Sequence, residues 1–383
     1  MSTDFFEQKR DWSKYKDQIL GYYLEPYIPK VAKLNKPIWI VDCFAGKGKF
    51  GDGEPGSPLI ISGLIQKWRS KGTDIQGLFI ESNASNYETL KHNLATRQDY
   101  STCKHGSFED SLGDLVALAK SNTVFLYLDP YTVKGLVFND LKAVYDQVHQ
   151  SGASVEVLMN LNVATFMRWA LAALKRRDDL PDISDEEDFL ADDPEESIEV
   201  SVLNGIAGGD YWQKLCENNE LPFAKKLERF TENYIEKMSS SFGYICAYPV
   251  KSKYEHQVPK YMLVYGTRHP DGLELMNDSM CTARSEFLSA QFNSGTLFDL
   301  TPSEETPDTS ELMKELLRIA EEVGHIDRKR LRIMSLSKFF CRFKKSTINK
   351  AVTELLKDKK LYSSTGKSRI KDTVVLSADP FDS

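Results

Sequence analysis

Apolar and polar positions follow two alternating periodicities over residues 38–160. Short apolar runs, which are typical of buried strands, are separated by stretches whose apolar residues recur three or four positions apart, as on one face of a helix. The pattern predicts strands at residues 38–43, 76–81, 101–105, 123–128 and 155–160, and helices at 59–71, 83–96, 112–120 and 139–150. Alternation of this kind predicts a parallel, doubly wound sheet with helices on both faces.

Two more apolar runs, at residues 244–250 and 261–265, complete the predicted sheet. Only about ten residues join them, which is too few for a crossover helix, so we expect an antiparallel hairpin at one edge. The predicted fold class is α/β, a Rossmann-like sheet of seven strands with this terminal hairpin. Ahead of the sheet, residues 5–33 have helical periodicity in two pieces broken at Pro26, since proline removes a backbone donor. These aromatic and basic helices either cover the sheet or contact nucleic acid.

The C-terminal part has a different pattern. Residues 293–309 are polar and contain prolines, which predicts a linker between a domain at 1–292 and a second domain at 310–383. Three amphipathic helices and two strands joined by a basic turn predict a winged helix-turn-helix, with its recognition helix at 346–358 and its wing at 364–372. Its basic side chains are expected to bind phosphates in a sequence-independent way, at Lys344, Lys345, Lys350, Lys367 and Arg369. Winged helices also bind proteins, and that alternative stays open.

Composition narrows the class of protein. The 383 residues carry a net charge of -7, which argues against a protein that coats nucleic acid but leaves room for local basic patches. Within a helical insertion at about 170–240, residues 176–199 are strongly acidic and form either a solvated segment, a lid or a docking site for a basic partner. Six scattered cysteines predict reduced thiols and no metal site made by this chain alone. Without a secretory leader or membrane-length apolar run, we expect a cytoplasmic protein with no membrane contact.

Candidate chemistry begins where the first predicted strand ends, at residues 38–57, IWIVDCFAGKGKFGDGEPGS. The D-x-F-A-G-x-G segment from Asp42 to Gly48 resembles the cofactor motif of class I S-adenosylmethionine-dependent methyltransferases, in the form common among enzymes that act on DNA and RNA bases. Glycines there would let the backbone approach a ligand closely. The resemblance implies that S-adenosyl-L-methionine binds at Asp42, Phe44, Ala45, Gly46 and Gly48. A plain nucleotide site or a structural tight turn would use the same residues.

Two further segments fit the same cofactor. Glu81 ends the second predicted strand, where dinucleotide-binding folds place an acid on the ribose hydroxyls. Its alternative role is to cap the helix that follows, although Asn83 could do so instead. After the third strand, Ser107 and Phe108 could lie beside the adenine, with the phenyl ring packed on the base. Turn and helix-cap roles explain these two residues equally well.

The fourth predicted strand ends in Asp129-Pro130-Tyr131. This segment resembles the D-P-P-Y loop with which amino-group methyltransferases hold an exocyclic nitrogen, which implies a catalytic role for all three residues. The second proline of that loop is missing, and an ordinary Asp-Pro turn is the alternative. Beyond the fifth strand, Asn160 could line a substrate cleft and Arg168 could contact a phosphate, or both could serve capping and packing.

A closer resemblance covers most of residues 5–285. The segments VDCFAGKGKFGDGEPGSP, LYLDPYTVKG and VEVLMNLNVATFMRW are similar to the three-Cys-motif partner family of bacterial proteins. That resemblance implies a methyltransferase-like fold and a separate, radical-SAM-like three-cysteine protein as a partner. It supplies no substrate.

Two functions therefore remain at this point. One is an S-adenosylmethionine-dependent methyltransferase that acts on the exocyclic amine of a nucleic-acid base, or on an associated nucleotide. The other is a non-catalytic accessory protein that binds nucleic acid or a protein partner, as in phage defence.

Overall fold

The computed structural model describes residues 9–150, 154–180, 198–253, 256, 258–293, 302 and 308–381. The chain divides into two compact units, Met1–His269 and Pro270–Ser383. The predicted acidic run falls largely outside the described residues, and so does most of the predicted linker. No helix in the described ranges is long and apolar enough to cross a membrane.

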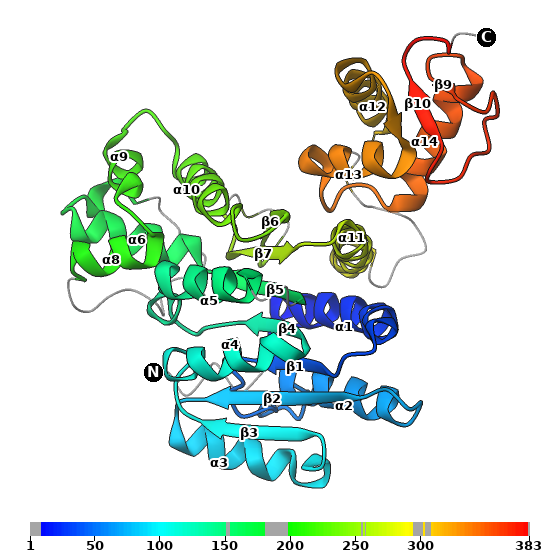
Figure 1. Ribbon diagram of the computed structural model, residues 1–383. Coiled ribbons are helices and arrows are strands. Elements are labelled where there is room, and N and C mark those ends of the chain that lie inside the picture. The colour runs from blue at the N-terminus through cyan, green and yellow to red at the C-terminus, as the bar shows by residue number, and fades with distance from the viewer. Residues whose placement is uncertain are drawn as a thin grey trace. The chain divides into compact units, whose positions relative to one another are not determined.

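The first unit is built on a seven-stranded sheet with the order β3-β2-β1-β4-β5-β7-β6 (Figure 1). The first five strands are parallel, β7 runs antiparallel to β5, and β6 is antiparallel to β7. The predicted mostly parallel sheet with a terminal hairpin is therefore confirmed, and it is consistent with a Rossmann-like methyltransferase fold. The strand bounds are β1 Ile38–Asp42, β2 Ile75–Glu81, β3 Ser101–His105, β4 Thr123–Leu128, β5 Ser154–Leu161, β6 Tyr244–Val250 and β7 Tyr261–Thr267.

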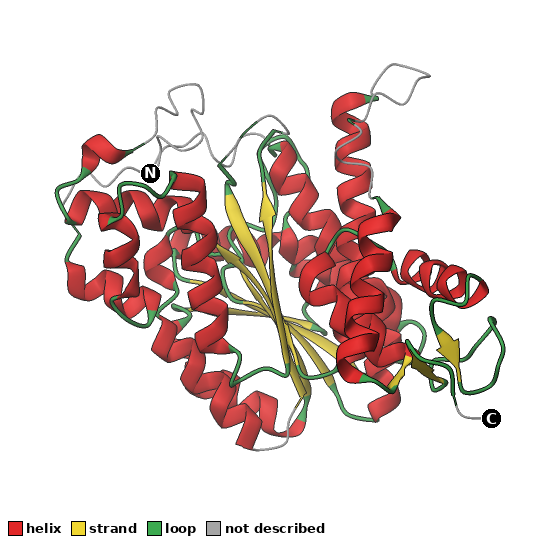
Figure 2. Cartoon of the chain, turned by 90° about the horizontal axis from the view of Figure 1, so that it is seen from above, coloured by secondary structure: helices red, strands yellow, loops and turns green. Residues whose placement is uncertain are grey.

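Helices lie on both faces of this sheet (Figure 2). Phe125 of β4 packs against α1, whereas its neighbours Val124 and Leu126 belong to the core that includes α4 and α5. This alternation is the period of two that a strand buried on both faces requires. The helices of the unit are α1 Asp11–Val31, α2 Ser57–Arg69, α3 Ala84–Asn93, α4 Leu112–Ser121, α5 Phe138–Gln150, α6 Val163–Ala173, α8 Val200–Ala207, α9 Tyr211–Glu217 and α10 Phe223–Met238.

The predicted break at Pro26 is wrong. Helix α1 continues through both Pro26 and Pro29. An interior proline costs about 3 kcal/mol or more, so tertiary packing must offset it. Tyr23 and Tyr27 stack at 5.3 Å between ring centroids, and Tyr23 also packs 5.5 Å from Phe125 of the sheet. Burial of these rings stabilises the helix enough to continue past both prolines.

The described residues of the second unit form four helices and a small antiparallel sheet of order β8-β10-β9. Its first helix, α11, packs on the turn between α13 and α14. The Asn277 side chain donates to the Phe343 carbonyl at 2.8 Å and accepts from the Cys341 amide at 2.9 Å. Its elements are α11 Pro270–Phe292, α12 Thr309–Val323, β8 Ile326–Asp327, α13 Arg328–Phe339, α14 Lys345–Lys357, β9 Tyr362–Ser363 and β10 Val375–Ser377.

The boundary between the units differs from the predicted one. The sequence assigned residues 270–292 to the first domain because the polar linker begins after them. In the structure, the contacts of Asn277 and the hydrogen bond from the Lys345 amide to Asp278 at 2.7 Å place α11 with the second unit. Periodicity alone shows that a helix exists, but it does not show which core its face joins.

Candidate cofactor and acceptor site

Four polar side chains meet at one edge of the sheet in the first unit. Glu81 ends β2, Asp42 ends β1, Asp129 follows β4, and Asn160 lies near the end of β5. These strands are consecutive in the sheet, although β1 and β4 are far apart in sequence. The chain order therefore reverses between β1 and β4. In open α/β sheets, ligands bind at the carboxyl ends of the strands beside such a switch point.

The turn after β1 is a cradle that needs glycine. Gly46 and Gly48 have φ values of 62° and 80°, in the left-handed region where a side chain is strained. A Cβ atom on Gly48 would lie 3.1 Å from Cδ1 of Leu90. The turn is thus packed tightly against α3 at Gly48. Its left-handed glycines meet the requirement for a close backbone approach to the adenosyl cofactor expected there.

Asp42 is fully buried beneath this turn. One carboxylate oxygen accepts from the Ser57 hydroxyl at 2.7 Å and the other from the Phe44 amide at 3.2 Å. Burial raises the pKa of Asp42 to about 7, although the Ser57 and Phe44 hydrogen bonds lower it; the nearby Asp129 adds to the rise. The carboxyl therefore titrates near neutrality and fixes the turn, with Ser57 as a partner that the motif did not reveal.

Glu81 holds the other side of the turn. It is buried, and its two oxygens accept from the amides of Gly46 and Asn83, each at 2.7 Å. Helix α3 is capped by Asn83, whose side chain accepts from the Asn86 amide at 3.0 Å. Each carboxylate oxygen has a second lone pair, so Glu81 retains capacity for ribose hydroxyls. The residues thus fit the cofactor on both sides of the turn.

The block GDGEPGS folds back onto the glycine turn. The Gly56 amide donates to the Gly48 carbonyl at 2.9 Å. Lys9 ties the block to the N-terminal segment, because its amide donates to Asp52 at 2.9 Å and its ammonium to the Pro55 carbonyl at 2.7 Å. Sequence reasoning singled out this block but missed Lys9, whose contacts lie more than forty positions away.

Ser107 and Phe108 have turn and packing roles in the structure. The Ser107 hydroxyl donates to the Asp110 carboxylate at 2.8 Å and accepts from the Asp110 amide at 3.1 Å. Phe108 is buried in the core, with its ring centroid 5.8 Å from that of Phe44. These contacts account for both residues without a ligand.

Asp129 is the centre of the predicted acceptor loop, Asp129-Pro130-Tyr131, which follows β4. Its carboxylate accepts from the Asn160 amide nitrogen at 2.8 Å and pairs with the Lys16 ammonium of α1 on the other oxygen. The Tyr127 hydroxyl lies 3.5 Å from that second oxygen. Lys16 was not among the predicted site residues. In the same loop, Tyr131 is 41% exposed.

The two predicted substrate residues near the end of β5 and in α6 lie in different environments. Within the described part of the chain, Oδ1 of Asn160 is buried and accepts no hydrogen bond, although Nδ2 binds Asp129. Arg168 is 6% exposed, within the buried helix α6, rather than presented to solvent as a phosphate contact. Asn162 caps α6 by accepting from the Thr165 amide at 3.1 Å. The structure brings Asn160, but not Arg168, to the acceptor loop.

The predicted basic residues of the second unit fall into two groups, one paired within the unit and one exposed to solvent. Lys345 begins α14 and donates to Glu274 of α11 at 2.8 Å, so its charge is used inside the unit. Lys344, Lys350, Lys367 and Arg369 are exposed, and no ion pair to them occurs among the described residues. Of the five predicted phosphate contacts, these four are exposed to solvent.

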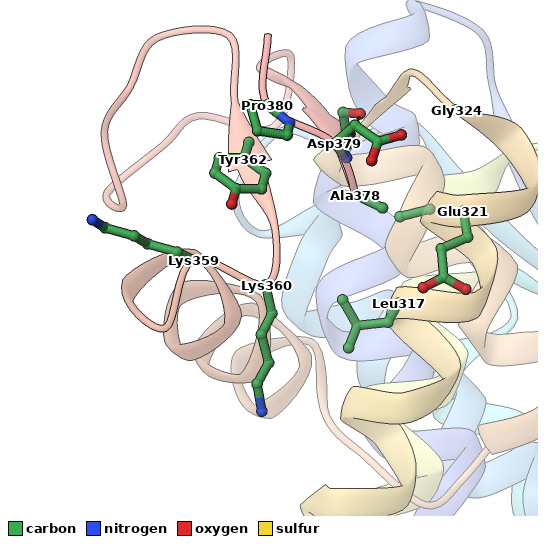
Figure 3. A pocket seen from close by; sticks show the side chains of 11 residues that line it. Leu317, Glu321, Gly324, Lys359, Lys360, Tyr362, Ala378, Asp379 and Pro380 are labelled. Carbon is green, nitrogen blue, oxygen red and sulfur yellow. Dashed lines mark hydrogen bonds between the residues drawn. The ribbon is translucent and has the colours of Figure 1, made fainter.

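A cavity of about 510 Å³ also lies in the second unit, between α12, the loop before β9 and the end of β10. Figure 3 shows Lys359 and Lys360 on one side, and Glu321 and Asp379 on the other. None of the predicted site residues lines it. Mixed charges at its rim select no ligand.

No family model matches the chain. No curated protein matches it either. Among solved structures, it is similar to a DUF519 protein from Legionella pneumophila, at 10% identity over 76% of this chain and 96% of that chain, with a TM-score of 0.40. The bifunctional kinase-methyltransferase WbdD is 11% identical over 70% of this chain and 44% of its own, with a TM-score of 0.35. The CcbJ methyltransferase from Streptomyces caelestis is 11% identical over 38% and 51%, at 0.25.

Structural similarity with TM-scores of 0.40 or less gives no information about the substrate or the site residues. The methyltransferase-like fold follows instead from the strand order and the antiparallel β7 described above.

Proposed function

We propose that the first unit binds S-adenosyl-L-methionine between the turn after β1 and Glu81, and transfers its methyl group to an exocyclic amine of a nucleic-acid base. The supporting observation is that Glu81, Asp42, Asp129 and Asn160 lie at the carboxyl ends of four consecutive strands. Cofactor groups and acceptor groups thus occupy neighbouring positions at one switch point.

Each residue has a role in this proposal. The cofactor supplies an activated methyl group on its sulfonium. The left-handed turn at Gly46 and Gly48 lets the backbone approach the cofactor, and Glu81 accepts hydrogen bonds from the ribose. An amine nucleophile must be oriented and must lose a proton. Asp129 accepts one amine hydrogen and then the proton, while the unpartnered Oδ1 of Asn160 accepts the second hydrogen.

The exposed basic side chains of the second unit extend the proposal to the acceptor. Lys350, Lys367 and Arg369 would bind phosphates of DNA or RNA without reading its sequence. In this proposal the second unit acts as a winged helix-turn-helix, with α14 and the loop between β9 and β10 toward the nucleic acid.

A second candidate is a non-catalytic accessory partner of a radical-SAM-like three-cysteine protein. The ion pair between Lys16 and Asp129 favours it, because a carboxylate neutralised by the chain's own ammonium is not free to hold a substrate amine. Whether the chain binds the cofactor and transfers methyl groups decides between the two.

Calorimetric titration with S-adenosyl-L-methionine is the first test. We expect wild type to bind, and Glu81→Ala to bind at least about tenfold more weakly, because a buried hydrogen-bonding partner of the ribose is lost. Glu88→Ala is the matched control, since this carboxylate is exposed on the adjacent helix α3. Absence of binding by wild type, or equal binding by Glu81→Ala, would contradict the proposal that the chain is a methyltransferase.

Transfer of a labelled methyl group to DNA and RNA is the second test. Asp129→Ala should retain cofactor binding and lose transfer, because the residue faces the acceptor. Cofactor binding without transfer to either nucleic acid would favour the accessory role.

A further inference from the structure

The ammonium of Lys16 occupies the place where the proposed function needs a substrate amine. Lys16 is 9% exposed, and its Nζ pairs with one oxygen of Asp129 while Asn160 holds the other. Each oxygen keeps a second lone pair, but an incoming amine must compete for this carboxylate with a cation of the chain itself.

Lys16 is held there by a chain of alternating charges. Its neighbour Asp17 is buried and pairs with Lys9 at 2.7 Å, and Lys9 is anchored on the backbone carbonyl of Pro55. Burial lowers the pKa of Lys16, but Asp129 and Asp17 raise it more, so the net pKa lies above its ordinary value. Lys16 thus stays charged, and losing Asp129 would leave it facing a less favourable environment.

The energetic consequence depends on what the acceptor carries. A neutral amine that takes Asp129 leaves the Lys16 ammonium buried without its closest counter-ion. Removing one partner of a buried ion pair is strongly unfavourable, which corresponds to a loss of affinity of roughly 100-fold or more. An acceptor that brings its own anion beside the amine would offset this loss, because the ammonium can pair with that anion instead.

We propose that Lys16 makes the acceptor subsite selective for nucleotides over nucleosides and free bases. On binding, Lys16 exchanges Asp129 for a phosphate of the acceptor while the exocyclic amine takes its place on Asp129 and Asn160. This inference rests on the proposed function and deepens it, because the phosphate beside the target base becomes a recognition element. It also explains how a neutralised Asp129 can serve an active site.

Binding of mononucleotides measures this selectivity directly. Dissociation constants for adenosine, adenosine 5′-monophosphate, cytidine and cytidine 5′-monophosphate are measured by calorimetry with S-adenosylhomocysteine present. Wild type should prefer at least one monophosphate over its nucleoside by about tenfold or more, as a charge-assisted contact predicts. Lys16→Met should abolish this preference, and Lys16→Arg should preserve most of it. Lys14→Met is the matched control, because Lys14 is exposed on the same helix, and it should leave the preference unchanged.

Three results would overturn the proposal: equal affinity of wild type for both members of each pair, an unchanged preference in Lys16→Met, or no binding of any of the four probes to wild type. Lys16→Met leaves the Asp129 carboxylate without its counter-ion, which could destabilise the fold. The double variant K16M/D129N removes both charges. It should fold, and it should show no phosphate preference. A phosphate preference that persists in the double variant also overturns it. The experiment requires no methyl transfer, so it can fail while the cofactor still binds.

Discussion

Asp42 shows how one buried carboxyl makes the stability of the fold depend on pH. Its pKa is raised to about 7 in the folded protein, mainly by burial, against an ordinary value of 3.8. Between these two values the folded state binds more protons than the unfolded state. The free energy of unfolding therefore falls as pH rises from about 4 through 7, and the loss from this group reaches a few kcal/mol, about 4 at most.

Asp42→Asn is expected to remove this dependence, since the amide does not titrate. Relative to wild type, the variant should gain stability as pH rises from about 4 to 7, where the folded state holds a proton on Asp42 that the unfolded state has lost. Urea unfolding at a series of pH values measures the difference, and comparison with wild type cancels the other titrating groups. A difference that is flat across this range would show that burial does not shift Asp42.

At the same scale, the sequence could identify some site residues and not others. Asp42, Gly46 and Gly48 form a contiguous motif, because a tight turn places its backbone requirements on neighbouring positions. Lys16 has no such signature. Its partner Asp129 lies 113 positions away, so its role exists only after α1 has packed on the sheet.

At the scale of elements, a buried polar network ties α1 to the sheet. Glu156 of β5 accepts hydrogen bonds from the hydroxyls of Tyr23, Tyr265 and Thr267, the last two at 3.0 and 2.9 Å. A buried carboxylate is tolerated only when it has such partners. The network therefore fixes the second half of α1, and with it the position from which Lys16 reaches Asp129.

Tyr23→Phe should lower the free energy of unfolding by about 1–3 kcal/mol, because it removes one donor from buried Glu156 and leaves the Tyr265 hydroxyl with one partner fewer. Tyr244→Phe, on the half-buried edge strand β6, is the control and should change stability little. Equal stability of both variants would mean that the network does not hold α1.

The sequence predicted where helices and strands begin and end better than it predicted which elements pack together. The predicted strands agree with β3, β4 and β6 at both ends, and β4 shows the reason most clearly, since an apolar run bounded by polar residues marks a strand buried in a sheet. The packing of α1 through two prolines and the membership of α11 were not predictable. Both depend on contacts between distant segments, which outweigh local propensity.

At the scale of the whole molecule, a net charge of -7 conceals an uneven distribution. In the second unit, Arg332 is fully buried and pairs with Glu274 and Asp372, and Arg328 also pairs with Asp372. Together with Lys345, these side chains stabilise the unit rather than a ligand. The sequence analysis expected Lys345 to bind phosphate because a sequence shows charge but not pairing.

This distinction predicts which basic residues bind nucleic acid. The double variant Lys367→Ala/Arg369→Ala should weaken binding to random-sequence duplex DNA or RNA, and should make the slope of log K against log salt shallower by about two, since two phosphate contacts are lost. Lys345→Ala is the matched control. It removes one positive charge as well, but that charge is paired with Glu274, so the slope should stay the same while the unit becomes less stable. Fluorescence anisotropy at several salt concentrations separates these outcomes. If the double variant keeps the wild-type slope, the exposed loop between β9 and β10 does not contact phosphates, and a protein partner becomes the better account of this surface.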